Sequence, residues 1–213
     1  MKFINQKIFN KMISMRKTKL IQHVNDYKLK LNALYELINF EDLEKITTQI
    51  IEAYKNGKTI YVAGNGGSAA TASHYQVDFG FFVRYFKKKR IKIRSLTDHS
   101  PLMTAIGNDN SYEQIFTQQM QDVFNQGDIL IAISASGNSM NLVKAVEYAN
   151  ELGGISIGLI GFDGGKLKDI CSLTLFTPNP KGDYGPIEDL HMSICHMLVT
   201  YLKNDEEFMK LYE

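Results

Sequence analysis

The chain has 213 residues, of which 44% are hydrophobic and 22% are charged, and its formal net charge is +1. This length is enough for one domain with a buried core. A net charge so close to zero excludes a global field that would attract nucleic acid or an anionic membrane. The longest apolar runs are far shorter than a membrane span.

The first segment, residues 1–21, is basic and loosely amphipathic but has no continuous apolar run, which argues against a signal peptide and favours a surface helix arm. From about Ile21 to Asn56 apolar residues recur at helical spacing and predict two helices. The break falls in the sequence NFEDL, with Asn39 or Glu41–Asp42 near the second N-terminus. We expect one domain over residues 1–213, in which residues 1–56 form a helical arm for oligomerisation.

The rest of the chain alternates between short apolar strands and segments of helical period. The strands are expected in residues 58–64, 90–96, 127–134, 153–161 and 171–178. The helices are expected over residues 68–79, 101–125, 138–152, 167–170 and 186–202. This alternation predicts an α/β three-layer sandwich with a five-stranded parallel sheet covered on both faces. Ligands of such sheets bind at the carboxyl ends of the strands.

A glycine-rich loop, GNGGSAA, follows the first predicted strand. Gly64, Gly66 and Gly67 permit a positive φ and a close approach of the backbone to a ligand. Ser68 is placed to cap the next helix, whose N-terminus favours an anion. The loop lacks the lysine of a Walker loop and the full spacing of a dinucleotide-binding turn. Taken alone, it is better explained as a tight strand-to-helix turn than as a phosphate site.

A second loop, SASGNSMN, again joins a strand to a helix. Its hydroxyls, on Ser134, Ser136 and Ser139, can hold a phosphate monoester together with helix N–H groups and without a cation. The alternative is a serine-rich capped turn without a ligand. The occurrence of two such loops on one parallel sheet argues against that alternative. The third glycine-rich loop, GFDGGKL, is interpreted as turn chemistry at Asp163–Gly165.

Two histidines and two carboxylates are candidates for the chemistry. His74 and Asp78 are four residues apart on the helix after the first loop, so they share a face, although a surface polar pair is the usual outcome of that spacing. On the last helix, a step of 100° per residue separates Glu188 and His196 from an apolar stripe. That stripe comprises Leu190, Ile194, Met197 and Leu198. His196 is therefore expected to face a pocket or a neighbouring subunit, and His191 is interpreted as structural.

These segments together resemble one known family. The sequences AGNGGSAATASHYQVDFG, AIGND, ISASGNSMNLVKAV, GFDGGKL and EDLHMSICHMLV, in this order, are similar to the sugar isomerase (SIS) domain family and most of all to its phosphoheptose isomerases. The resemblance covers about residues 21–203. It implies a flavodoxin-like SIS fold and conversion of sedoheptulose 7-phosphate to a glycero-manno-heptose 7-phosphate for bacterial lipopolysaccharide or capsule. Isomerisation of another ketose phosphate is an alternative.

The resemblance also implies roles for individual residues. Asp78 and His196 become the acid/base pair that moves a proton between C1 and C2 through an enediol, a task suited to a carboxylate and an imidazole. The family carries glutamate at the position of Asp78, so this carboxylate is set back by roughly 1.5 Å, about one bond. The substrate-binding residues implied by the resemblance are Asn65, Gly66, Gly67, Ser68, Asp109, Ser134, Ala135, Ser136, Ser139 and Glu188.

A zinc site is implied in the same place. Some family members bind zinc with His, Glu, Gln and His, and the matching residues here are His74, Asp78, Glu188 and His196. All four are ligand types that zinc accepts, although Glu188 replaces the usual glutamine and offers an ion pair with a histidine as an alternative. A bound zinc would polarise the substrate carbonyl.

A different class of protein shares this fold. Some relatives are non-catalytic sugar-phosphate sensors, and one, which resembles phosphoheptose isomerase, binds a bacterial replication initiator but lacks a histidine at the position of His196 and the helix carboxylate. Both groups are present here, which favours catalysis. The family also implies a homotetramer with shared active sites, in agreement with the apolar stripes of the two leading helices.

Three further features have simpler interpretations. Arg84 lies near the family's substrate-side arginine, but about two extra residues shift the alignment there. The basic run at residues 87–90 is interpreted as a solvated turn rather than a nucleic-acid patch. Cys171 and Cys195 form neither a disulfide framework nor a metal-ligand spacing, which indicates a reducing, cytoplasmic setting.

Overall fold

A computed structural model describes residues 6–81 and 90–211, with side chains described from residue 13 onward. Arg84 and most of the basic run at residues 87–90 lie outside the described residues. The sheet contains β1 (Thr59–Gly64), β2 (Lys92–Ser95), β3 (Ile129–Ser134), β4 (Ile155–Ile160) and β5 (Leu173–Phe176). All four pairings are parallel and the strand order is β2-β1-β3-β4-β5. This order is the flavodoxin-like arrangement, which changes direction between β1 and β3.

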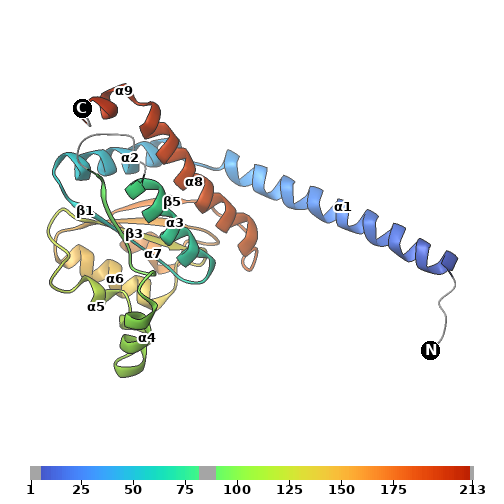
Figure 1. Ribbon diagram of the computed structural model, residues 1–213, viewed down its shortest axis with the longest axis horizontal. Coiled ribbons are helices and arrows are strands. Elements are labelled where there is room, and N and C mark those ends of the chain that lie inside the picture. The colour runs from blue at the N-terminus through green and yellow to red at the C-terminus, as the bar shows by residue number, and fades with distance from the viewer. Residues whose placement is uncertain (1–5, 82–89, 212–213) are drawn as a thin grey trace.

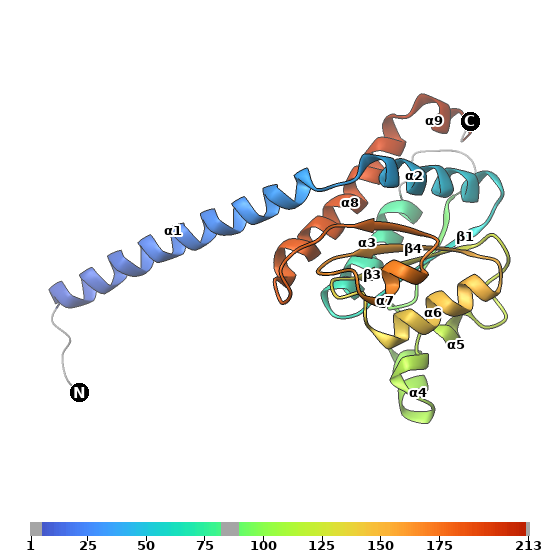
Figure 2. The same cartoon turned by 180° about the vertical axis from the view of Figure 1, so that it is seen from behind.

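Helices cover both faces of the sheet (Figures 1 and 2). One face carries α2 (Phe40–Lys55), α3 (Gly67–Phe81) and α8 (Tyr184–Asn204), and the other carries α4 (Ser100–Asp109), α5 (Thr117–Met120), α6 (Met140–Glu151) and α7 (Gly165–Ile170). The strands alternate between two cores, as a period of two requires. Ile131 and Ile133 pack on the first face, and Leu130 and Ala132 pack on the second. The three-layer α/β sandwich with its parallel sheet is thus confirmed.

The first helix, α1 (Gln6–Glu36), extends away from this body as a long arm (Figure 1). The end nearest the body is tied to α8 by an ion pair of 2.8 Å between Lys30 and Asp183 and by a hydrogen bond of 2.8 Å between Tyr35 and Ser193. The chain then turns at Asn39, whose side chain accepts from the backbone N–H groups of Glu41 and Asp42. Asn39 is therefore the predicted N-cap of the second helix.

Three details differ from the sequence prediction. The single helix expected over residues 101–125 is wrong, because α4 ends at Asp109 and is followed by the 3₁₀ helix η2 (Tyr112–Gln114) and the single-turn α5. The run Asn108–Ser111 explains the break, since such side chains favour turns over helix interiors. A short last helix, α9 (Glu206–Lys210), was not predicted, although Asp205 caps it.

The third difference concerns Ser68, which lies inside the first turn of α3 rather than at its cap. Gly66, two positions earlier, adopts a φ of +56°, and its carbonyl accepts from the N–H groups of Ala69 and Ala70. Gly66 therefore takes the capping position, which a positive φ reserves for glycine. No described helix has the combination of length and apolar character needed to cross a membrane.

Candidate active site

A cavity of about 150 Å³ lies at the carboxyl ends of β1 and β3, where the strand order changes direction. The loop after β1, the loop after β3 and the start of α8 line it. Its lining residues are Asn65, Ser68, Ile133, Ser134, Ala135, Ser136, Ser139, Tyr184 and Glu188. None of these side chains is cationic. The two loops singled out in the sequence therefore meet in one pocket, and any anion there is held by hydroxyl and N–H donors.

Among the described residues, none accepts a hydrogen bond from the Ser134, Ser136 or Ser139 hydroxyl of the β3–α6 loop. Ser134 Oγ accepts from the N–H of Gly137 at 3.0 Å, and Ser136 Oγ accepts from the N–H of Asn138 at 3.3 Å. Ser139 occupies the N-cap position of α6 without a side-chain cap hydrogen bond. Because each hydroxyl that accepts a backbone N–H can still donate its own hydrogen, the loop presents donors to the pocket.

Glycine is required at two places around this pocket. A Cβ at Gly67 would lie 2.2 Å from Oε2 of Glu188, so α3 and α8 approach closely only because Gly67 has no side chain. Gly137 has a φ of +64°, and a Cβ there would lie 1.9 Å from the carbonyl oxygen of Gly164. The β3–α6 loop is thus packed against the third glycine-rich loop, where Gly164 and Gly165 make the predicted turn.

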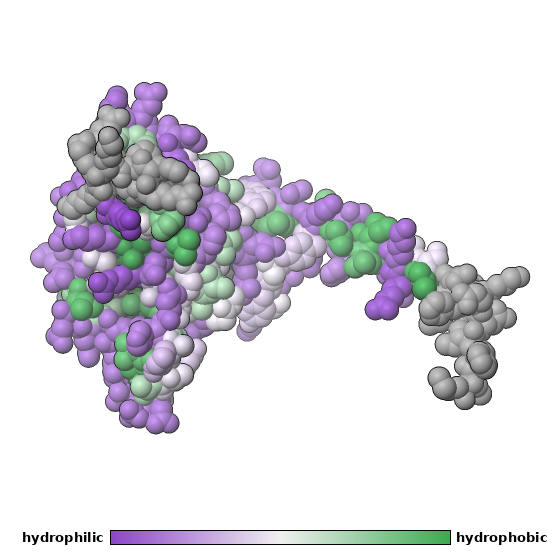
Figure 3. Space-filling model, in the orientation of Figure 1, coloured by the Kyte–Doolittle hydropathy of each residue, from purple (hydrophilic) through white to green (hydrophobic). Residues whose placement is uncertain are grey.

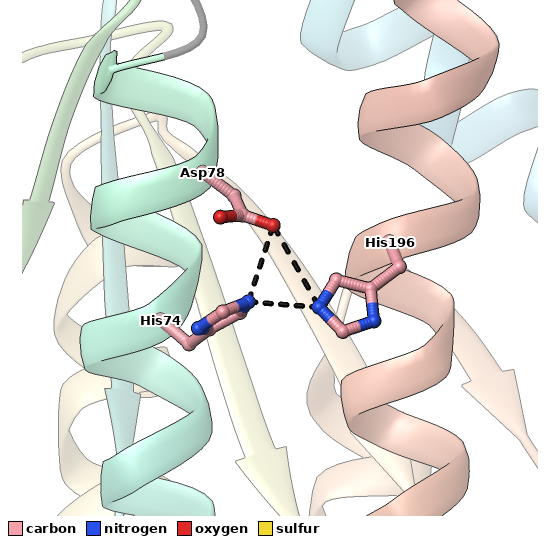
Figure 4. A group of neighbouring side chains, drawn as sticks. All are labelled: His74, Asp78 and His196. Carbon is pink, nitrogen blue, oxygen red and sulfur yellow. Dashed lines mark hydrogen bonds and ion pairs between the residues drawn. The ribbon is translucent and has the colours of Figure 1, made fainter.

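Beside the pocket, α3 and α8 bring His74, Asp78 and His196 together (Figure 4). His74 Nε2 lies 2.8 Å from His196 Nε2 and 3.1 Å from Asp78 Oδ2, and His196 Nε2 lies 3.7 Å from the same oxygen. The two rings meet edge to face, at an interplanar angle of 82°. The side chain of His196 is 52% exposed. The prediction that His196 points away from its own core is thereby confirmed.

These three side chains can hold a metal ion, since their ligand atoms all lie within 4.8 Å of one another. Two imidazole nitrogens in contact need either one shared proton or a cation between their lone pairs. Tetrahedral zinc with bonds of about 2.0–2.2 Å sets its ligand atoms roughly 3.3–3.6 Å apart. The observed separations of 2.8, 3.1 and 3.7 Å bracket that spacing, so the donor set fits zinc.

Glu188 lies outside this group and lines the pocket with the serines. Burial, and to a lesser extent the charge of Asp189, raise the pKa of its carboxyl group. The structure thus separates Glu188 from the three other predicted zinc ligands. Its carboxylate faces the first turn of α3 instead, where the helix dipole favours negative charge.

The remaining predicted residues fall into two sets. Asn65 and Ala135 line the pocket as expected. Asp109 is exposed at the end of α4, where it accepts a hydrogen bond from Asn108 at 2.8 Å, and it does not line the pocket. Met197, predicted to face the core, is 38% exposed, whereas Leu190, Ile194 and Leu198 are buried.

Sequence reasoning missed three residues around the pocket, namely Tyr112, Asn141 and Tyr184. Tyr184 lines the pocket directly, and Tyr112 and Asn141 both hydrogen-bond Asn65. Asn141 was visible as the last residue of the SASGNSMN loop. Tyr112 and Tyr184 gave no signal, because a tyrosine after a turn or before a helix is ordinary.

Comparisons with known proteins identify the family of this fold. The SIS domain model matches residues 23–161. The phosphoheptose isomerase of Aliarcobacter butzleri is 38% identical over 166 residues, covering 78% of this chain and 86% of the relative. The enzyme of the same name from Aneurinibacillus thermoaerophilus is 40% identical over 163 residues, covering 76% and 80%. The structure of phosphoheptose isomerase GmhA from Neisseria gonorrhoeae matches with a TM-score of 0.79 at 26% identity, covering 89% and 99%.

The fold, the loops and these matches define a sugar isomerase domain enzyme. The chain belongs to the SIS domain family and, within it, to the phosphoheptose isomerases.

Proposed function

We propose that the chain converts D-sedoheptulose 7-phosphate to D-glycero-D-manno-heptose 7-phosphate. The observation that carries this proposal is that the His74–Asp78–His196 group and the hydroxyl-lined pocket lie along the same pair of packed helices, α3 and α8. One end of the substrate would bind through its phosphate, and the other would meet the acid/base residues.

The separation of the two ends suits a long sugar. Ser68 and His74 are six positions apart along α3, and Glu188 and His196 are eight positions apart along α8, which correspond to roughly 9 and 12 Å of helix rise. A carbon chain advances about 1.3 Å per bond, as the 3.8 Å spacing over three backbone bonds shows. C2 of a heptulose 7-phosphate is seven bonds from phosphorus, or roughly 9 Å. A pentulose 5-phosphate, with five bonds, spans only about 6 Å.

The acid/base work is assigned to Asp78 and His196. One of them removes a proton from C1 of the ketose while the carbonyl oxygen at C2 gains a proton, which gives the enediol. C2 is then protonated and the hydroxyl at C1 loses its proton, so the aldose forms with no net gain or loss of atoms. His74 contacts both groups and holds them in place.

We propose that zinc binds to His74, Asp78 and His196, with Glu188 as a fourth ligand only if its side chain leaves the pocket. A bound zinc would supply charge that polarises the substrate carbonyl. The convergence of the three donors and the fit of their spacing to zinc support this proposal.

We also propose that the enzyme is a homotetramer whose neighbouring subunits complete the active site. The described part of α1 exposes Leu20, Ile21, Val24 and Leu29, each at least 42% exposed. Apolar side chains gather along the arm in the space-filling view (Figure 3). The exposed edge of His196 leaves the catalytic group open on one side, where a second subunit would close it. Use of the product for lipopolysaccharide or capsule stays a prediction.

Proton exchange into the product tests the reaction directly. The protein is incubated with sedoheptulose 7-phosphate in deuterium oxide and the sugar is followed by NMR. We expect a heptose 7-phosphate that carries deuterium at C2. Turnover of ribulose 5-phosphate or fructose 6-phosphate in preference to the heptulose would support another ketose phosphate isomerase. Binding without any exchange would favour a non-catalytic sugar-phosphate-binding protein.

A further inference from the structure

The side-chain amide of Asn65 is held by two other residues at the edge of the pocket. Its Oδ1 accepts from the hydroxyl of Tyr112 at 3.0 Å and from Nδ2 of Asn141 at 2.9 Å. Its Nδ2 donates to Oδ1 of Asn141, also at 2.9 Å. The three residues come from the end of β1, the 3₁₀ helix η2 and the first turn of α6. They form a closed network that includes neither the serine hydroxyls nor the His74–Asp78–His196 group.

The backbone determines the orientation of this network. The N–H of Leu142 donates to Oδ1 of Asn141 at 2.9 Å, so the oxygen of Asn141 must be the atom on that side. Nδ2 of Asn141 then faces Oδ1 of Asn65 and donates to it. With the Tyr112 hydroxyl as a second donor, both lone pairs of the Asn65 oxygen are used. A flipped Asn65 amide would place its N–H groups against the N–H of Asn141.

One N–H of Asn65 remains available in this orientation. An amide nitrogen carries two hydrogens, and Asn141 accepts one of them. Among the described residues no acceptor is found for the second hydrogen, and Asn65 lines the pocket together with the serine hydroxyls. That hydrogen is therefore left for a ligand, and an anion is the acceptor that gains most from a further donor in a pocket without cations.

We propose that Tyr112 and Asn141 are positioning residues that lock the Asn65 amide with one N–H directed to the phosphate of the bound sugar. This inference rests on the proposed phosphate pocket, and it assigns a role to two residues that do not themselves line that pocket. Tyr112 holds Asn65 without lining the pocket itself. Its own position is fixed because η2 is anchored on α6 by an ion pair of 2.5 Å between Lys144 and Glu113. Tyr112 is 62% exposed, and among the described residues its hydroxyl donates to Asn65.

A double-mutant cycle on Tyr112 and Asn65 separates positioning from direct contact. The Kd of inorganic phosphate is measured by calorimetry for the full-length wild type, Tyr112→Phe, Asn65→Ala and the double variant. We expect Tyr112→Phe to weaken phosphate binding about three- to tenfold in the wild type, as the loss of one hydrogen bond would. In the Asn65→Ala background the same change should have no further effect. Tyr201→Phe, an exposed tyrosine far along α8, is the matched control.

Steady-state kinetics adds an independent readout. Tyr112→Phe is expected to raise KM for the sugar phosphate while kcat stays within about twofold, because the acid/base group is not touched. An equal loss of phosphate affinity in both backgrounds would show that Tyr112 contacts the ligand itself, and no loss in either would remove its role. Failure of the wild type to bind phosphate would overturn the pocket assignment as well. Melting temperatures identify any variant that fails for lack of folding.

Discussion

Asp78 shows how a shortened side chain is accommodated in the His74–Asp78–His196 group. The missing methylene predicts a carboxylate set back by roughly one bond. Its Oδ2 nevertheless lies 3.1 Å from Nε2 of His74, which shares its helix face. The shorter side chain shows its effect on the other side, where Oδ2 lies 3.7 Å from Nε2 of His196 on α8. The three side chains therefore still lie together. A longer side chain at position 78 would mainly change the distance to His196 on α8.

The first prediction concerns His196. His196→Gln should lower kcat about 100-fold or more and leave the fold intact, because the variant removes the proposed acid/base group from an exposed position. If His196 also binds zinc, the variant should contain less metal than the wild type, and chelation should inactivate the wild type. Activity and metal content are measured on the same preparations, with circular dichroism as the check of folding.

His23→Gln serves as the control, since His23 is exposed on α1 and lies outside the group. Loss of activity in His196→Gln, together with a wild type that contains no metal, would support acid/base work alone. Full activity of His196→Gln would refute the assignment of the catalytic histidine and favour a different base.

His191 leads to a prediction about stability and pH. It is buried, and among the described residues neither ring nitrogen has a hydrogen-bond partner. Burial lowers the pKa of this imidazole to about 4 from the ordinary 6.5. As the pH falls from about 6.5 to about 4, His191 binds a proton in the unfolded chain but not in the folded chain. Stability present above pH 6.5 is thus lost across that window, by about 3 kcal/mol in all.

Chemical denaturation at several pH values tests this sign. His191→Leu should show a shallower loss of unfolding free energy between pH 7 and pH 5 than the wild type. A loss of the same steepness in both proteins would mean that His191 is not the group that titrates.

At the scale of elements, the sequence was informative wherever burial alone determines whether a segment is a strand or a helix. Strands such as β3, buried along its whole length, and amphipathic helices such as α8 were predicted close to their observed bounds. The segment 101–125 failed because its apolar residues serve three short elements, and periodicity does not reveal a break made by the Asn108–Ser111 turn. Ser68 failed as a cap because a glycine carbonyl, which has no side-chain signal, took that position.

The β3–α6 loop carries the prediction at this scale. Ser134→Ala combined with Ser136→Ala should weaken binding of the phosphorylated sugar far more than it lowers the melting temperature. Each hydrogen bond lost to a charged group is worth roughly 1.5–3 kcal/mol, and together they predict a rise in KM of at least 100-fold. Some loss of stability is expected too, because both hydroxyls also accept loop N–H groups.

Ser14→Ala, on the exposed part of α1, is the control for this pair. KM for sedoheptulose 7-phosphate and the inhibition constant of inorganic phosphate are measured for both variants. Unchanged constants in the double variant would remove the loop from the phosphate site.

At the scale of the whole molecule, the site could be only partly predicted. His74 and His196 are separated by 122 positions, and only the packing of α3 on α8 brings their Nε2 atoms to 2.8 Å. The same packing places Glu188 against Gly67 and away from the metal-competent group, which ligand types and spacing along one helix did not reveal. The contact of Tyr112 with Asn65 likewise depends on how η2 folds back onto α6.

The apolar stripe of α1 gives the last prediction. Leu20 and Val24 lie about 40° apart on the helix and are 61% and 42% exposed, an arrangement that favours burial against another subunit. Leu20→Asp combined with Val24→Asp should convert the proposed tetramer to smaller species by placing charges in that contact. Activity should fall with it, because the open side of His196 is then left uncovered. Thr18→Asp combined with Gln22→Asp changes the opposite side of the same helix and should leave the proposed tetramer intact. Light scattering and activity are measured at one protein concentration, and a wild type that is monomeric and fully active would rule out shared active sites.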